Sequence, residues 1–259
     1  IHADFANFLV CEAGVDLNDY TMFTEKDFSS ENVDFLFSFG GDGTFLETLK
    51  YVKKSGLPVL GINTGRLGFL ANISRDEMIS AIDDLCEGKY SLEDRSLMQI
   101  ELSGSDVVNF KAALNEISVH KKDVAMITIV TELDGEYLNS YWADGLIIST
   151  PTGSTAYSMS VGGPIMLPES KSFIISPVSP HNLTVRPIVI PDNKEIKLSV
   201  KSRSNKFLVA IDSTSYEVSS AVDLVIRKAP YSLKMIKFED NNFYNTLRNK
   251  LMWGMDKRN

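Results

Sequence analysis

The chain has 259 residues, of which 44% are hydrophobic and 23% are charged. These fractions match average globular proteins, which excludes collagen-like, low-complexity and disordered classes. The formal net charge of −8 disfavours a general nucleic-acid or anionic-membrane surface, because accumulated Lys and Arg bind such partners. No stretch reaches the roughly 20 apolar residues that span a bilayer, and the first residues lack the order of a secretory signal. We therefore expect a cytoplasmic protein that binds neither nucleic acid nor membranes.

The first third of the sequence predicts alternating strands and helices. Residues 33–39 form a short apolar run, typical of a buried strand. Glycines end it, and residues 44–54 then have helical spacing. A second buried strand is predicted at residues 58–62. Ser74 and Glu77 form a capping box that opens a helix to about residue 88. This order favours a parallel α/β sheet.

From about residue 90 the hydrophobic period becomes two, which predicts a mainly β region. Asp134-Gly135 is a strong hairpin signal, because that turn needs positive φ at both central residues. Strands are predicted at residues 98–102, 112–119, 126–133, 172–178, 195–200, 207–211, 222–226 and 233–238. Helical spacing returns at residues 241–253, and the excess of basic residues from position 227 onward is interpreted as a solvated helix face and tail.

A glycine-rich loop, Gly40-Gly41-Asp42-Gly43-Thr44, lies between the first predicted strand and helix. Glycines let backbone N–H groups turn toward an anion, and a helix start favours negative charge. The alternative is a tight turn in which Asp42 caps the helix. The carboxylate favours the phosphate site, since it can accept a hydroxyl proton or hold Mg²⁺.

A second loop, residues 61–69, also follows a predicted strand, where open α/β sheets place their ligands. Arg66 could reach a phosphate there, although loop arginines are more often plain surface residues.

Two polar residues, Asn115 and Glu116, interrupt the apolar run predicted as strand 112–119. Neighbouring strand residues point to opposite faces, so at least one should enter the protein or a cleft. Glu116 can accept two hydrogen bonds, as from a ribose diol, and Asn115 could address a base or a hydroxyl. The alternative is an edge strand with one face exposed to solvent.

The longest pattern runs from Asp144 to Ser158, where a strand enters a loop rich in hydroxyls and glycine and then a short helix near Ser154. Small side chains allow a ligand to approach the backbone, and Tyr157 offers an aromatic face. Many Ser/Thr-rich loops are only loops. A serine nucleophile is disfavoured, because the only histidines are His2, His120 and His181 and no Gly-x-Ser-x-Gly motif occurs.

These four patterns, in this order, resemble the bacterial NAD kinases over nearly the whole chain. The resemblance continues in Gly162-Gly163-Pro164-Ile165, Ser179-Pro180-His181-Asn182 and Phe243-Tyr244-Asn245-Thr246-Leu247. Diacylglycerol and sphingosine kinases and the phosphofructokinase-like superfamily share the first loop. The run Asp-Gly-Leu-Ile-Ile-Ser-Thr-Pro-Thr-Gly-Ser-Thr-Ala-Tyr is specific to NAD kinases.

The resemblance implies that ATP, with Mg²⁺ or Mn²⁺, phosphorylates the 2′-hydroxyl of the adenosine ribose of NAD. Asp42 would be the general base, and Asp144 would bind near the nicotinamide-side ribose or carboxamide. Asn115 and Glu116 would hold the NAD ribose and adenine region. The remaining implied nucleotide-binding residues are Gly41, Gly43, Thr44, Arg66, Thr155, Ala156, Tyr157, Ser158, Ser160 and His181.

The implied fold is a Rossmann-like, phosphofructokinase-like α/β domain followed by a β-sandwich-like domain, with the dinucleotide between them. We expect the α/β nucleotide-binding domain at residues 1–93, a mainly β domain carrying much of the NAD site at 94–238, and a C-terminal helical segment at 239–259 that packs back on the first domain. The family forms homodimers and homotetramers in which a neighbouring subunit completes the site, with His181 near that contact.

The chain departs from the family pattern in three places. Trp142-Ala143 stands where many members have Arg-Ser, which puts a phosphate-pairing role there in doubt, and Asp212-Ser213 stands where the family has Asp-Gly. Family members have a strand and loop ahead of the first helix, whereas this chain starts at Ile1 without methionine. We expect that the true start is missing.

Two other functions stay open at this point. A lipid kinase of the same superfamily should have a greasy acceptor pocket, which the Asn115-Glu116 pair and the hydroxyl-rich loop argue against. A dinucleotide-binding sensor without catalysis is the other, and the presence of Asp42 argues against it.

Overall fold

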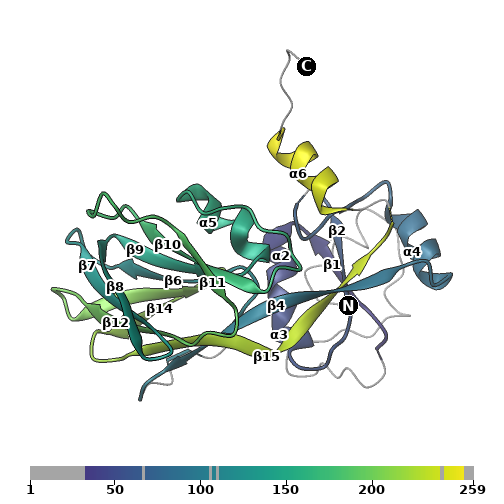
Figure 1. Cartoon of the computed structure of the whole chain (residues 1–259). Coiled ribbons are helices and arrows are strands. Elements are labelled where there is room, and N and C mark those ends of the chain that lie inside the picture. Colours follow the sequence, from purple (N-terminus) through teal and green to yellow (C-terminus); the bar gives the residue numbers. More distant parts are fainter. Residues whose placement is uncertain (1–32, 66–67, 105–106, 109–110, 240–241, 254–259) are drawn as a thin grey trace, which may run out of the picture. The chain divides into compact units, whose positions relative to one another are not determined.

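The computed structural model (Figure 1) describes residues 33–65, 68–104, 107–108, 111–239 and 242–253. The chain divides into two compact units, and the first is assembled from two distant parts of the sequence. Unit 1 comprises Ile1–Leu92 and Lys234–Asn259, and unit 2 comprises Glu93–Leu233. None of the helices in the described ranges is long and apolar enough to cross a membrane.

Unit 1 contains a small parallel sheet, as the sequence predicts. Strand β1 (Leu36–Gly40) pairs in parallel with β2 (Val59–Asn63), and β3 (Ile73–Ser74) pairs in parallel with the end of β2. Met235, near the end of strand β15 (Leu224–Lys237), pairs in parallel with Val59. All residues of β2 are buried, so the loop that follows it is anchored in the core of the unit.

The helices of unit 1 differ in detail from the prediction. Residues 44–54 are not one helix, because α2 (Asp42–Glu47) and α3 (Leu49–Val52) are separated at Thr48, whose hydroxyl donates to the Phe45 carbonyl at 2.7 Å. Helix α4 (Met78–Cys86) starts later than predicted.

The delay of α4 and the start of the last helix both follow from capping contacts. Glu77 accepts from the Ser74 N–H at 2.8 Å and from its hydroxyl at 2.7 Å, but this contact closes a turn ahead of the helix. Helix α6 (Phe243–Leu251) lies within the predicted residues 241–253 and is capped by Asn242, which accepts from the Asn245 N–H at 2.9 Å.

Unit 2 is built from two antiparallel sheet layers. One sheet has the order β11-β10-β9-β6-β13-β14, and the other contains β15-β12-β7-β8. The strands of the first sheet are β6 (Glu116–Lys121), β9 (Gly145–Ser149), β10 (Ser172–Val178), β11 (Ile188–Pro191), β13 (Lys206–Ile211) and β14 (Thr214–Ser219). The second sheet has β7 (Ile127–Leu133), β8 (Glu136–Ala143) and β12 (Ile196–Lys201), with β4 (Ser91–Leu102) and β5 (Ala112–Ala113) at the side of β15.

The core of unit 2 draws apolar side chains from both sheets. Ile129, Phe173, Phe207 and Ile226 are fully buried members of this one cluster. The β7–β8 hairpin turns at Asp134-Gly135 with φ of 51° and 81°, as predicted. The α/β unit, the sandwich-like β unit and the return of the C-terminal helix to the first unit confirm the expected fold class.

Three predicted strands differ from the structure in their bounds. Residues 222–226 and 233–238 belong to one strand, β15, because the polar residues and Pro230 between them interrupt the hydrophobic pattern but not the extended backbone. The predicted strand 112–119 is broken into β5 and β6. Strands β11 and β14 were not predicted.

Candidate active site

The Asp42 carboxylate is bound by backbone N–H groups of the loop that follows β2. Oδ2 accepts from Phe69 at 2.9 Å, and Oδ1 accepts from Leu70 at 2.9 Å and Ala71 at 3.1 Å. Asp42 is the first residue of α2, whose N-cap is Gly41, and makes no capping bond. The alternative in which Asp42 caps the helix is therefore wrong; its side chain ties the glycine loop to residues 69–71.

Lys250 of helix α6 also reaches Asp42. Its Nζ lies 3.4 Å from Oδ2 of Asp42 and 4.5 Å from the centroid of the Phe69 ring. Burial raises the pKa of Asp42, but the three backbone donors and the Lys250 charge outweigh it and the pKa is lowered. Asp42 is ionised at neutral pH.

Lys250 was not predicted, because it lies 208 residues from Asp42 in the sequence. Lys250 is exposed, in agreement with the expected solvated helix face, but it also reaches Asp42. A signal was present: Lys250 follows Phe243 by seven residues, which places a cation on the apolar face of the predicted helix.

The glycine loop leaves its backbone accessible. A Cβ at Gly41 or Gly43 would meet nothing within 4 Å, and Gly43 and Thr44 are exposed. Gly40 has φ of 153° and lies against the Thr44 side chain, so it makes the turn possible. Arg66 lies outside the described residues.

Gly68 is the residue that allows Asp42 to reach the second loop. A Cβ placed on Gly68 would lie 1.9 Å from Oδ1 of Asp42, so no larger residue fits without moving the carboxylate. Gly65, in the same loop, has open space around it.

In unit 2, Asn115 lies in the break between β5 and β6, and Glu116 is the first residue of β6. The Asp212 carboxylate accepts from the N–H groups of Leu114 at 2.9 Å, Asn115 at 2.8 Å and Glu116 at 3.0 Å. These donors therefore bond to a side chain and not to a neighbouring strand, which explains why β5 ends and β6 begins here.

Glu116 and Asp212 are buried carboxyl groups with raised pKa values. Burial and then the nearby charge of Asp212 raise the pKa of Glu116 to about 8, against a hydrogen bond from the Tyr157 backbone. Burial raises the pKa of Asp212 to about 6, although its three backbone donors oppose this. Glu116 Oε2 is buried without a hydrogen-bond partner among the described residues. Glu116 is thus mostly protonated at neutral pH and has an oxygen available for a ligand.

The hydroxyl-rich loop packs on the backbone of Asn115. It folds as a 3₁₀ turn, η2 (Thr152–Thr155), and one helical turn, α5 (Tyr157–Ser160). The Thr150 N–H donates to the Asn115 carbonyl at 2.9 Å, and a Cβ on Gly153 would lie 2.1 Å from the same oxygen. The loop and the Asn115-Glu116 break therefore form one cluster.

The side chains of this loop point in different directions. Tyr157 is partly exposed, and its ring stacks on His120 with centroids 5.6 Å apart. Ser158 is fully buried and its hydroxyl lies 3.1 Å from Ser176, so it faces the interior. Ser160 is exposed, and Thr155 and Ala156 are half-buried.

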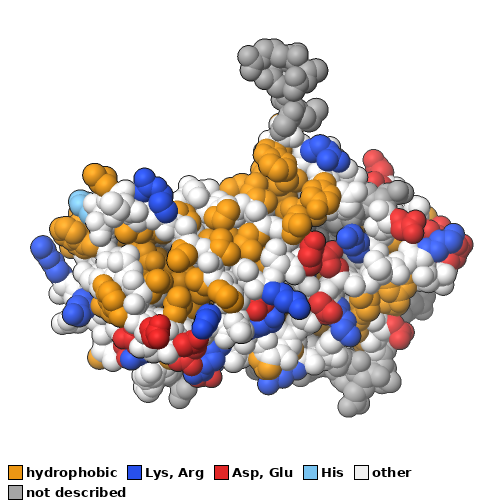
Figure 2. Space-filling model, viewed as in Figure 1, with side chains coloured by type: hydrophobic (Ala, Val, Ile, Leu, Met, Phe, Trp, Pro, Cys, Tyr) orange, Lys and Arg blue, Asp and Glu red, His pale blue; other side chains and the backbone are white. Residues whose placement is uncertain are grey.

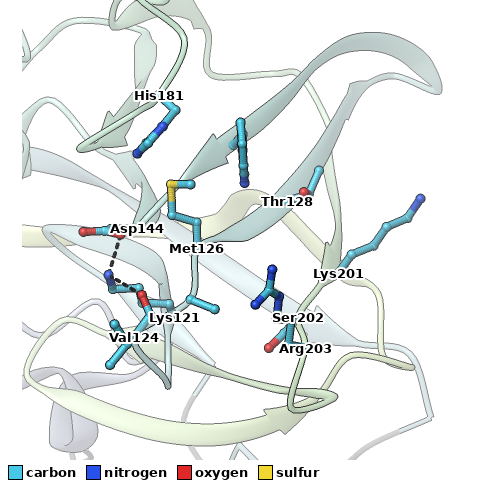
Figure 3. Close-up of a pocket in the computed structure, with 11 residues that line it drawn as sticks. Lys121, Val124, Met126, Thr128, Asp144, His181, Lys201, Ser202 and Arg203 are labelled. Atoms are coloured by element: carbon cyan, nitrogen blue, oxygen red, sulfur yellow. Dashed lines mark hydrogen bonds and ion pairs between the residues drawn. The ribbon is translucent and has the colours of Figure 1, made fainter.

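Asp144 and His181 lie together in a separate groove of unit 2 (Figure 3). The groove has a volume of about 790 Å³, and the Lys121 ammonium lies 2.6 Å from Asp144. The centroid of the His181 ring lies 5.2 Å from that of the Trp142 ring. The lining residues also include Lys201 and Arg203, so three basic side chains and one carboxylate, that of Asp144, line the groove.

Comparison with known proteins identifies the family. Residues 10–90 match the model of the ATP-NAD kinase N-terminal domain and residues 114–238 that of the C-terminal domain. An NAD kinase of Flavobacterium psychrophilum is 47% identical over 100% of this chain and 89% of its own length, and one of Bacteroides fragilis is 48% identical over 98% and 87%. The chain belongs to the NAD kinase family. It is an enzyme that phosphorylates NAD, which sets aside the lipid-kinase and sensor alternatives.

Solved structures agree with this assignment. An NAD kinase from Archaeoglobus fulgidus in complex with ATP has a TM-score of 0.74 at 27% identity and covers 95% of this chain and 94% of its own. The yeast NADH kinase complexed with NADH has a TM-score of 0.84 at 23% identity over 99% of this chain and 78% of its own, which shows the shared fold.

Substitution of Gly68 by alanine should displace the Asp42 carboxylate. We expect the turnover of Gly68→Ala to fall roughly 10²-fold, the typical cost of misplacing a reacting group by about 1 Å. Gly65→Ala is the matched control and should keep wild-type turnover, since its methyl group meets nothing within 4 Å. Steady-state rates of NADP formation measure both variants. Equal rates for the two would contradict the importance of the Asp42 position.

The raised pKa of Glu116 should make stability depend on pH. The folded state keeps a proton near pH 8 that the unfolded chain releases near its ordinary pKa of 4.5, so this contribution is complete below pH 4.5 and is lost as pH rises through about 8. The free energy of unfolding should fall by about 1 kcal/mol between pH 7 and 8. Glu116→Gln should remove this fall in urea titrations, and an unchanged slope would refute the shift.

Proposed function

We propose that this enzyme transfers the γ-phosphoryl group of ATP to the 2′-hydroxyl of the adenosine ribose of NAD, with Asp42 as the acceptor of the hydroxyl proton. The observation that supports this is the fixed position of a partly exposed carboxylate in a glycine loop. An ionised carboxylate has about four lone-pair directions, and backbone N–H groups use three. The fourth, on Oδ2, holds only the long contact to the Lys250 ammonium at 3.4 Å, which a substrate hydroxyl can displace.

The lowered pKa of Asp42 defines what kind of base it is. A weak base gives little driving force for early proton removal. Phosphoryl transfer passes through a loose transition state, however, and depends chiefly on positioning and charge neutralisation. Asp42 therefore orients the 2′-hydroxyl first and takes its proton as the new P–O bond forms, while the bond from the γ-phosphorus to ADP breaks and ADP leaves. Gly41, Gly43, Thr44 and Arg66 are assigned to the phosphates.

Glu116 and Asn115 are assigned to the ribose and adenine region of NAD. The unpartnered Oε2 of Glu116 would gain a hydrogen bond from a ribose hydroxyl, which removes the cost of a buried polar atom without a partner. Because its pKa is about 8, the carboxyl group can donate as well as accept. Thr155, Ala156, Tyr157 and Ser160 line the dinucleotide site in this proposal, whereas the buried Ser158 supports the loop.

Asp144 and His181 are assigned to the nicotinamide side of NAD. Lys121 sets the orientation of the Asp144 carboxylate, and its backbone N–H donates to the Asp144 carbonyl at 2.9 Å.

A divalent metal ion, Mg²⁺ or Mn²⁺, is part of the proposal. Mg²⁺ is commonly held by one or two carboxylates and substrate phosphates. Because the Asp42 carboxylate already accepts from three backbone N–H groups, the substrate phosphates would supply the main ligands of the ion. When bound, the ion neutralises charge on the ATP phosphates. The described residues include no group of three or more potential metal-ligating side chains.

We also propose a homodimer or homotetramer in the cytoplasm. Strand β11 is an edge of its sheet and exposes Ile188 and Val189, 38% and 46% exposed. Figure 2 shows hydrophobic side chains gathered over the part of unit 2 near β11 and α5. An apolar sheet edge of this kind is suited to a second copy of the chain.

Removal of the Asp42 charge tests the proposed reaction. With NAD, ATP and Mg²⁺, the wild type should form NADP, read through an NADP-specific dehydrogenase, and EDTA should abolish the signal. Asp42→Asn should lower turnover by about 10² to 10⁴ while NAD still binds.

The asparagine has one acceptor oxygen for the three backbone donors, so the substitution can also weaken the local structure. NAD affinity and melting temperature are therefore measured alongside turnover. Turnover at the wild-type level would remove Asp42 from its role. A phosphorylated form of NAD that the NADP-specific dehydrogenase does not accept would refute the 2′-hydroxyl as acceptor.

Glu116 variants test the ribose assignment. Glu116→Ala should raise the KM for NAD about tenfold, the cost of one or two lost hydrogen bonds, and leave the KM for ATP unchanged. Glu116→Gln should have a smaller effect at pH 7, because an amide resembles the protonated carboxyl group. Glu217→Gln, at an exposed ion pair of the same unit, is the control. Equal changes for NAD and ATP would speak against the assignment.

A further inference from the structure

Lys250 places a positive charge beside the carboxylate of the proposed base. Its side chain is 31% exposed, so the contact lies at the surface and is open to a ligand. The contact with Asp42 Oδ2, at 3.4 Å, is longer than the 2.7–2.9 Å typical of a strong charge-assisted hydrogen bond. The ammonium is therefore near Asp42 but makes only a weak hydrogen bond to it. Its three N–H donors can also bind a second anion.

The position of Lys250 is fixed by the helix that carries it. Asn242 caps α6, Leu247 is buried, and the Phe243 ring lies 6.3 Å from that of Phe69. Lys250 extends from the same face of α6 as Phe243, and its ammonium lies over the same Phe69 ring. Phe69 itself donates its backbone N–H to Asp42. One residue thus links the helix, the cation and the carboxylate.

The three backbone donors approach Asp42 from residues 69–71, and Lys250 approaches the remaining side of Oδ2. A hydroxyl bound to that oxygen would lie next to the ammonium. The phosphoryl group that this hydroxyl attacks must arrive at the same place, and a phosphate that approaches a carboxylate without a counter-charge is repelled.

We infer that Lys250 is a phosphate-binding residue of the kinase, whose ammonium contacts the transferred phosphoryl group of ATP and offsets the charge of Asp42. This inference rests on the proposed role of Asp42. A lysine is suited to the task, because it acts on phosphate as a mobile point charge with three donors.

The test compares two substitutions on one helix. Lys250→Met should lower kcat/KM for ATP roughly 10²-fold, the usual cost of a charge-stabilising donor, while the Kd for NAD changes less than about threefold. Arg248→Met removes the same charge from an exposed site on α6 and should keep wild-type kinetics. Lys250→Arg should recover part of the loss. Lys250→Gln replaces the methionine variant if that one does not fold.

Three outcomes would overturn the inference: wild-type kinetics in Lys250→Met, an equal loss in Arg248→Met, or a rise in the Kd for NAD as large as the loss for ATP. Failure of the proposed function is read separately. An active Asp42→Asn removes the role of Asp42, whereas an inactive Asp42→Asn beside a fully active Lys250→Met removes only the inference about Lys250.

Discussion

The site of each unit depends on a carboxylate that accepts hydrogen bonds from three successive backbone N–H groups. Asp42 binds residues 69–71 and Asp212 binds residues 114–116. Both segments leave regular pairing at these points, where buried N–H groups need other partners. A single side chain supplies all three bonds in each case. The chain can therefore hold irregular backbone rigidly beside a strand, which is what a nucleotide site requires.

The two carboxylates differ in their electrostatics, and the difference suits their positions. Asp42 has a lowered pKa because its donors and Lys250 outweigh partial burial, whereas the pKa of Asp212 is raised because deep burial dominates. Asp42 is partly exposed, and besides its three backbone donors its carboxylate has only the long contact to Lys250 at 3.4 Å. Asp212 is enclosed, acts as a support, and through its charge raises the pKa of Glu116. Similar local geometry thus holds the proposed base in one unit and a supporting carboxyl group in the other.

Local patterns in the sequence predicted most of the fold but only part of the candidate site. The glycine loop, the β2 strand, the Asp134-Gly135 turn and the α6 helix depend on neighbouring residues, so spacing and turn chemistry predict them. Asp212 and Lys250 could not be placed, because their partners lie 96 to 98 and 208 residues away. The break at Asn115 escaped prediction for the same reason: the residue that replaces the strand pairing comes from another part of the chain.

Unit 1 is assembled from segments that lie on both sides of unit 2 in the sequence. During synthesis the ribosome makes Asp42 early, then all of unit 2, and only afterwards the strand residues near Met235 and the helix with Lys250. The Lys250 ammonium can therefore reach the proposed base only after nearly the whole described chain has left the ribosome. Partly made chains hold a glycine loop whose carboxylate lacks its cation, so the order of translation itself delays the complete arrangement around Asp42.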